Sequence, residues 1–238
     1  MPFEKIVLSG VWKDRRCLDD LFQADRIPHR FTIESSQQLK DLVVLANAYR
    51  RRVNVLFRLS SENQFGVDSA TLKELIAGLG MVVTNFNHTP EGIASMDPEV
   101  SIAKFSDFCR TIDVAAALGS PNVTMVAAFP FGKSHWDFIE LRHLAEMQVW
   151  SYQDWEANYE HFVDVVRRCC AYAREKGVRV LIEAHPYRWV NSTQSMLRLI
   201  EHVGADNLGM NFDPSHLLWQ GVNPAIFLRD FKDRVYHV

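Results

Sequence analysis

Acidic residues and histidines follow two neighbouring apolar runs near the end of the 238-residue sequence. Glu183 and His185 follow the first run, and Asp213 and His216 follow the second. Short apolar runs are typical of buried parallel strands, whose carboxyl ends meet at one edge of a sheet. Carboxylates combined with an imidazole can bind a divalent metal or transfer a proton. The spacing therefore predicts a polar site at these strand ends.

Each of these residues also has a purely structural interpretation. A carboxylate buried in an apolar strand without a partner costs several kcal/mol, which favours a functional role for Glu183. Asp213 precedes Pro214 and could instead cap the following turn, so only its pairing with Glu183 favours a site. His216 is explained equally well as a capped loop histidine. His185 is better explained as a pocket or wall residue than as a ligand.

Eight short apolar runs along the sequence are typical of strands, and helical patterns separate them. The predicted strands are residues 6–12, 30–33, 53–59, 82–87, 123–129, 178–184, 208–213 and 235–238. Eight strands with seven helical segments predict an α/β fold, a (β/α)₈ TIM barrel without its last helix, as a single domain over residues 1–238. An eighth strand that no helix covers favours association into a homo-oligomer.

The clearest helix signal lies between Asp97 and Gly119. Asp97 is a typical N-cap, Pro98 suits the first helical position, and Gly119 predicts the end. The predicted buried face of this helix includes Ile102, Phe108, Ile112 and Ala115. Residues 130–152 are rich in aromatic side chains and histidine, and they predict a loop with some helix folded over the barrel mouth.

The composition is that of an ordinary soluble protein. The formal net charge of −3 provides no bulk attraction to nucleic acid or to an anionic membrane. Four cysteines without C-x-x-C spacing suggest packing thiols in a reducing compartment. Neither a signal peptide nor an apolar run of membrane-spanning length is apparent. The expectation is a cytoplasmic protein that binds neither nucleic acid nor membrane.

From about Met81 onwards, the sequence resembles the xylose-isomerase-like sugar isomerase and epimerase family of TIM barrels. The residues that carry the resemblance are Asp97-Pro-Glu, Ala115-Ala-Ala-Leu-Gly119, Leu181-Ile-Glu183-Ala-His-Pro186, Gly209-Met-Asn-Phe-Asp213-Pro-Ser-His216-Leu-Leu-Trp-Gln-Gly221 and Asp233-Arg-Val-Tyr-His237-Val238. The resemblance covers about two thirds of the chain, and the run from Asn211 to Gly221 is highly specific.

This resemblance implies a metal-dependent sugar or sugar phosphate isomerase or epimerase, in which a glutamate transfers a proton at the carbon next to a carbonyl. Glu183 matches the first metal-binding carboxylate and the acid/base residue, and Asp213 matches the second ligand. His216 matches a substrate-contacting histidine that is itself a ligand in some relatives. Oxygen ligands with one imidazole suit Mn²⁺, Mg²⁺ or Co²⁺.

His185 and His88 match positions that line the sugar pocket, although each is also explained as a wall residue. Strand alternation puts His237 on the same face as a missing family ligand, one layer lower, where it either binds substrate in the pocket or points into the wall. The sequence departs from the family after Val235, where a His-x-His-x-Lys-Asp motif is normal and the second histidine is a ligand. Here the sequence stops at Val238, before that ligand and the next catalytic glutamate. The expectation is a weakly held metal and low activity if the chain ends there.

The first part of the chain resembles a different barrel family. Ile6-Val-Leu-Ser-Gly10, Phe31-Thr-Ile-Glu-Ser35 and Asn63-Gln-Phe-Gly-Val-Asp68 resemble fold-type III pyridoxal-phosphate decarboxylases and racemases. The Schiff-base lysine and the phosphate loop of that family have no match, so pyridoxal phosphate binding is not expected. The two resemblances meet near residues 78–90. They support an alternative hypothesis, a catalytically inactive chimeric or designed barrel built from two families.

Overall fold

The computed structural model describes residues 7–8, 15–28, 30–33, 36–57, 69–78, 80–130 and 152–238. Most of the predicted loop at 130–152 and the run at 63–68 lie outside these described residues. The chain forms two compact units, Met1–Met81 and Val82–Val238.

The first unit is a three-stranded parallel sheet with helices between its strands. Its elements are β1 (Val7–Leu8), α1 (Arg15–Gln23), β2 (Arg30–Ile33), α2 (Ser36–Ala48), β3 (Val55–Phe57) and α3 (Ser69–Gly78). The strand order is β1-β2-β3. Phe31 and Ile33 from β2 are buried against Leu18 of α1 and Leu39 and Leu42 of α2. Helices α1 and α2 form because each presents one apolar face to this core.

The second unit is a five-stranded parallel sheet in the order β4-β5-β6-β7-β8. Its elements are β4 (Phe86–His88), α4 (Pro98–Ala117), β5 (Asn122–Val126), α6 (Tyr152–Glu175), β6 (Arg179–Glu183), α7 (Thr193–Val203), β7 (Leu208–Asn211), α8 (Pro214–Trp219), α9 (Pro224–Phe231), the 3₁₀ turn η4 (Lys232–Arg234) and β8 (Val235–His237). Strands β5, β6 and β7 are buried along nearly their whole length. Such continuous apolar strands are typical of a parallel sheet covered on both faces.

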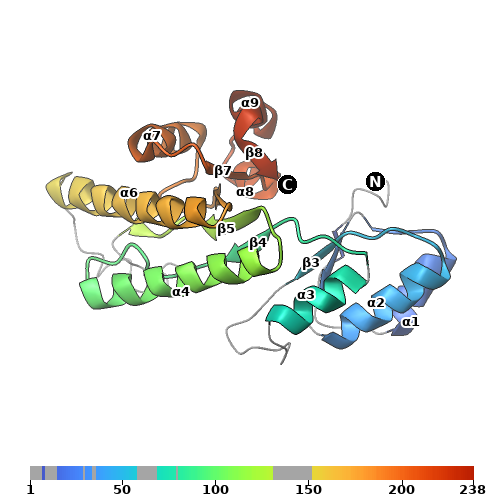
Figure 1. The fold of residues 1–238 in the computed structure, drawn as a ribbon. Coiled ribbons are helices and arrows are strands. Elements are labelled where there is room, and N and C mark those ends of the chain that lie inside the picture. Colours follow the sequence, from blue (N-terminus) through green and yellow to red (C-terminus); the bar gives the residue numbers. More distant parts are fainter. Residues whose placement is uncertain are drawn as a thin grey trace, which may run out of the picture. The chain divides into compact units, whose positions relative to one another are not determined.

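Helices α4, α6 and α7 pack side by side along this sheet (Figure 1). Helix α6 buries one apolar stripe, which comprises Phe162, Val165, Val166, Cys169, Cys170 and Ala173. This spacing of three and four residues produces a single buried face. Burial raises the pKa of the Cys170 thiol to about 12, so this cysteine packs as an apolar side chain.

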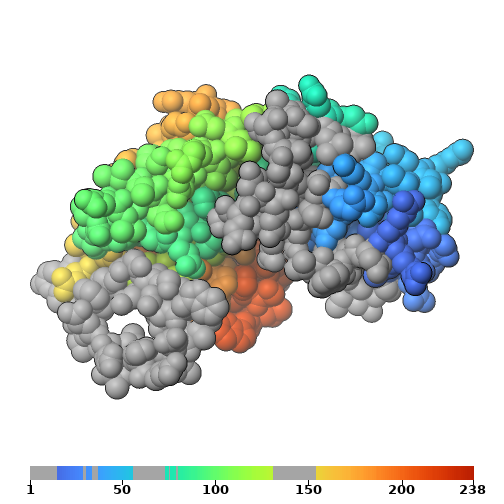
Figure 2. Space-filling view, turned by 90° about the horizontal axis from the view of Figure 1, so that it is seen from below, coloured from blue at the N-terminus to red at the C-terminus, as the bar shows by residue number. Residues whose placement is uncertain are grey.

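Helix α4 begins and ends where its sequence predicts, and Phe108, Ile112 and Ala115 of its predicted face are buried, but Ile102 is not. The backbone N–H of Glu99 donates to Oδ1 of the N-cap Asp97 at 3.0 Å. Ile102, predicted to be buried, is 61% exposed, and α4 lies at the molecular surface in Figure 2. The prediction was wrong because Ser101 takes the inward position, where its hydroxyl donates to the carbonyl of Ile93.

The described residues contain eight parallel strands alternating with helices, which confirms the predicted α/β fold. One short helix, α8, was predicted only as a turn. Within the described part of the chain, no helix is both long and apolar enough to cross a membrane.

Candidate active site

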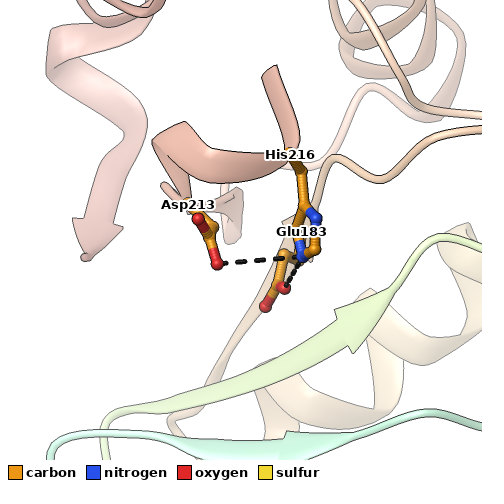
Figure 3. Close-up of side chains that lie close together, drawn as sticks. All are labelled: Glu183, Asp213 and His216. Atoms are coloured by element: carbon orange, nitrogen blue, oxygen red, sulfur yellow. Dashed lines mark ion pairs between the residues drawn. The ribbon is translucent and has the colours of Figure 1, made fainter. Parts of the chain in front are cut away.

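Three of the predicted site residues, Glu183, Asp213 and His216, lie together in the second unit (Figure 3). His216 Nε2 lies 3.4 Å from Oε1 of Glu183 and 3.8 Å from Oδ2 of Asp213. One ligand atom from each residue lies within 4.8 Å of the other two. Glu183 is buried, whereas the other two side chains are partly exposed. The group is therefore reachable from solvent on one side.

Neighbouring strand ends bring these residues together. Glu183 is the last residue of β6, and β7 beside it ends at Asn211, two residues before Asp213. Asp213 is the N-cap of α8, where its Oδ1 accepts a hydrogen bond from the backbone N–H of Ser215 at 2.8 Å. His216 follows in the first turn of that helix. The capping role that the sequence offered for Asp213 therefore coexists with its place in the cluster, since Oδ2 remains directed at His216.

The strand register determines which side chains share the face of Glu183. Glu183 pairs with Asn211, and Asn211 pairs with His237 of β8. Paired residues of a parallel sheet point to the same face, and the next residue along each strand points to the other. His88 is in register with Met125 and Ile182, on the opposite face from Glu183. Asn87 is consequently on the site face of β4.

Two asparagines orient the Glu183 carboxylate. The side-chain amide of Asn211 donates to Oε2 at 2.5 Å, and that of Asn87 donates to the same oxygen at 3.4 Å. Because a carboxylate only accepts, Asn211 must direct its amide nitrogen towards Glu183 and its Oδ1 towards His237. His237 Nδ1 lies 2.7 Å from that oxygen and therefore donates to it. Oε1 of Glu183 remains directed at His216.

Neither asparagine was identified from the sequence, although a signal existed. Asn211 is a polar residue inside an apolar strand, at the position that pairs with Glu183. The strand register is needed to identify such residues. Asn87 and His88 are adjacent in the sequence, and only the register shows that Asn87 faces the site.

The other three predicted histidines differ in their relation to the cluster. The ring of His185 lies 4.1 Å from the ring of His216, and burial lowers its pKa. His237 donates to Asn211, which in turn donates to Glu183. The structure does not bring His88 to the group: its Nδ1 lies 2.7 Å from the hydroxyl of Thr111 on α4, and burial lowers its pKa.

The charges of the cluster favour a cation. The hydrogen bond with Glu183 raises the pKa of His216 above its usual 6.5, against an opposing effect of burial, and the charge of Asp213 adds to the increase. Two carboxylates and one imidazole within 4.8 Å can also hold a divalent metal through oxygen and nitrogen ligands. A proton and a metal ion therefore compete for the imidazole of His216.

Replacing Asn211 with leucine is expected to weaken Mn²⁺ binding about tenfold to hundredfold, because Glu183 loses its closest orienting partner. Calorimetric titration with Mn²⁺ measures the effect. Met210→Leu is the matched control, since Met210 is buried on the same strand but faces away from Glu183. Equal affinities for the folded Asn211→Leu and control variants would contradict an orienting role for Asn211.

Comparison with known proteins identifies the family. The family model described as "Xylose isomerase-like TIM barrel" matches residues 50–238. The chain belongs to the xylose isomerase-like TIM barrel family. The match begins at residue 50 and so includes part of the segment that resembles the pyridoxal-phosphate family. The origin of the chain as a chimera stays an interpretation.

Individual relatives match shorter parts of the chain. An uncharacterized protein of Bacillus subtilis is 26% identical over 136 residues, which are 54% of this chain and 42% of the relative. Inosose dehydratase 2 of Bacillus cereus is 25% identical over 83 residues, 35% of this chain and 28% of the relative. The matches thus span less than half the length of these relatives. The structure of a D-allulose 3-epimerase from Methylomonas sp. in complex with D-allulose has a TM-score of 0.60 at 17% identity, covering 96% of this chain and 67% of that one.

Proposed function

We propose that this barrel catalyses metal-dependent proton transfer at the carbon next to the carbonyl of a sugar or sugar phosphate, as an epimerase or isomerase. The convergence of Glu183, Asp213 and His216 at the strand ends is the observation that carries the proposal. The position of active sites at the carboxyl ends of TIM-barrel strands supports it. The name of the D-allulose 3-epimerase supports a sugar as the substrate.

Glu183, Asp213 and His216 are the residues that would hold the metal, and Mn²⁺, Mg²⁺ and Co²⁺ suit their ligand atoms. When bound, the ion would polarise the carbonyl and hydroxyl oxygens of the sugar. The donor set fits such an ion, because the three ligand atoms lie within 4.8 Å of one another while two of the side chains remain partly exposed.

Glu183 is the proposed base. Asn211 and Asn87 bind its Oε2 and hold the carboxylate in one orientation, which leaves Oε1 to accept a proton from carbon. The carbon–hydrogen bond breaks, and its electron pair spreads onto the neighbouring carbonyl oxygen as an enediolate. The Glu183 carboxyl then exchanges this proton with water, which reaches the group from its partly exposed side. A proton delivered by water to the other face of the same carbon re-forms the carbonyl and produces the epimer. Return of the proton from Glu183 to the neighbouring carbon, with transfer of the enediol hydroxyl proton to the other oxygen, produces the isomer.

Dehydration is a second candidate, favoured by the name of the inosose dehydratase among the relatives. Elimination starts with the same removal of a proton next to a carbonyl, after which a hydroxyl group leaves as water from the adjacent carbon. The two reactions therefore share the role of Glu183 and differ in what leaves the substrate.

Deuterium uptake tests the proposed function and separates it from an inactive scaffold. With Mn²⁺ in D₂O, the protein is expected to introduce deuterium next to the carbonyl of D-allulose or inosose, as followed by NMR, and only elimination would also produce an unsaturated ketone. Glu183→Gln should slow the uptake about 10²-fold to 10⁴-fold, the usual contribution of a general base. Equal uptake with and without Glu183 would contradict its role. No uptake by a protein that binds Mn²⁺ normally would favour the scaffold.

A further inference from the structure

Arg188 lies buried in the loop that follows β6, and the proposed reaction does not use it. This residue is 6% exposed, and among the described residues the only other buried charged side chain is that of Glu183. Burial lowers the pKa of the Arg188 guanidinium, while the negative charges of Glu91 and Glu183 act in the opposite direction. Taking a charged side chain out of water costs free energy, which an apolar side chain of similar size would avoid. The buried charge therefore points to a role other than filling space.

The guanidinium of Arg188 connects its own loop, residues 184–192, to two other strand ends. Nη1 donates to the carbonyl oxygen of Ala127, directly after β5, at 3.0 Å. The guanidinium carbon lies 3.9 Å from the ring centroid of Phe129. Nη2 lies 3.9 Å from Oε1 of Glu91, in the segment that follows β4. One side chain thus attaches the loop after β6 to the segments after β4 and β5.

The turn at residues 185–190 within this loop is strained. Tyr187 has a φ of +63°, a left-handed conformation that residues with large side chains rarely adopt. Such strain persists only where the surrounding contacts maintain it. The backbone N–H of Trp189 donates to the carbonyl of Ala128 at 3.0 Å. This bond and the side chain of Arg188 both hold the strained turn to the end of β5.

The strained turn also determines where two rings meet α8. The ring centroids of His185 and His216 lie 4.1 Å apart, and those of Tyr187 and Trp219 lie 5.9 Å apart. His216 and Trp219 both belong to α8 and lie about one helical turn apart. A shift of the turn would move both rings of the loop away from α8, and the imidazole of His216 would be less well oriented.

We propose that Arg188 is a positioning residue, which holds the loop 184–192 against α8 and so fixes the imidazole of His216 for the proposed metal and substrate. Arg188 acts through His185 rather than by contact with either. Metal ligands are normally oriented by residues behind them, and the loss of such a residue weakens metal binding. The expected effect on metal binding rests on the proposed function, whereas the expected effect on the ring contact is independent of any ion.

Arg188→Met tests the proposal, because methionine keeps an apolar stem and removes both the donor and the charge. The first measurement is the proton–proton NOE between the rings of His185 and His216 in the metal-free protein. This NOE should be clear in the wild type and strongly reduced in the variant. The second measurement is the affinity for Mn²⁺ by calorimetric titration, which should fall about tenfold.

Arg179→Met is the matched control, because Arg179 makes the same kinds of contact at the opposite end of β6. Its Nη1 donates to Oδ1 of Asn122 at 3.3 Å, and its guanidinium carbon lies 4.3 Å from the ring centroid of Tyr236. A variant that acts only through stability would behave like this control. The control should retain both the NOE and the affinity of the wild type for Mn²⁺.

An Arg188→Met protein that keeps the NOE would overturn the proposal, and so would equal losses of the NOE in the Arg188 and Arg179 variants. Loss of the NOE with unchanged Mn²⁺ affinity would overturn the role of Arg188 at His216. A wild type that binds no Mn²⁺ would contradict the proposed function, and the NOE alone would then decide the role of Arg188. If Arg188→Met does not fold, Phe129→Leu removes only the ring beside the guanidinium and should also reduce the NOE; an unchanged NOE in that variant would overturn the proposal.

Discussion

Glu183→Gln combined with Asp213→Asn is expected to reduce the affinity for Mn²⁺ at least a hundredfold. The double variant removes both negative ligands but keeps the size of each side chain. Asparagine is also a good N-cap, so the start of α8 should be preserved. A calorimetric titration that is unchanged in the double variant would refute the metal site.

A matched control distinguishes the loss of a carboxylate within the cluster from the loss of a carboxylate elsewhere on the surface. Asp206→Asn removes an exposed carboxylate that pairs with Arg174, outside the cluster, and it should leave Mn²⁺ binding unchanged. The thermal midpoints of the three proteins, measured without metal, show whether each is folded. With excess Mn²⁺, only the wild type and the control should gain stability, because a ligand stabilises the state that binds it.

The same titration should depend on pH through His216. Its pKa is raised mainly by the hydrogen bond with Glu183, so the imidazole is protonated over a wider range than usual. A metal must displace that proton, and Mn²⁺ affinity should therefore increase as the pH rises through the raised pKa. The metal-free protein behaves in the opposite way: the stabilisation by protonated His216 is fully present below 6.5 and is lost as the pH rises through the folded pKa. Mn²⁺ binding with equal affinity at pH 6 and pH 8 would contradict His216 as a ligand.

Gly209→Ala is expected to destabilise the second unit by about 1–3 kcal/mol, the typical cost of overpacking. A β-carbon at Gly209 would contact the ring of Tyr236, with Cε2 at 2.6 Å, and would lie 2.9 Å from the carbonyl oxygen of Arg234. The backbone of β7 and the side of β8 meet here too closely for any side chain. Relief requires β8 to move, and with it His237.

Thermal unfolding and hydrogen exchange of the β8 amides measure this effect. Adding Tyr236→Ala should recover part of the loss, because the ring contact disappears while the contact with Arg234 remains. Gly78→Ala is the control, since a β-carbon there meets nothing within 4 Å and alanine favours the helix α3. A Gly209→Ala protein as stable as the control would show that β7 and β8 are not packed as described.

Much of the architecture was predictable because it depends on local patterns. Apolar runs predicted the strands, and Asp97 with Pro98 predicted the start of α4. The proximity of Glu183 and Asp213 followed from their positions at neighbouring strand ends. The predicted buried face of α4 was correct for Phe108, Ile112 and Ala115 and wrong for Ile102 at its start. No local pattern shows that the Ser101 hydroxyl donates inward to the carbonyl of Ile93.

The roles of Asn87 and Asn211 depend on pairing between strands far apart in the sequence. Asn87 lies 96 positions from Glu183, and only the register of β4, β5 and β6 shows that it shares the face of that carboxylate. The same register turns His88 towards α4. Predictions from residue type alone could not distinguish these adjacent residues, because both are polar and both lie near the end of one short strand.

The two oxygens of the Asp213 carboxylate have different roles at this site, one in capping α8 and one in the candidate site. The first turn of α8 holds one carboxylate oxygen of Asp213 through protein hydrogen bonds alone, and the other oxygen faces His216. The proposed ligand set is thus preorganised, and the proposed ion would enter with little loss of conformational entropy. We therefore expect metal exchange at this site to be rapid and reversible without local unfolding.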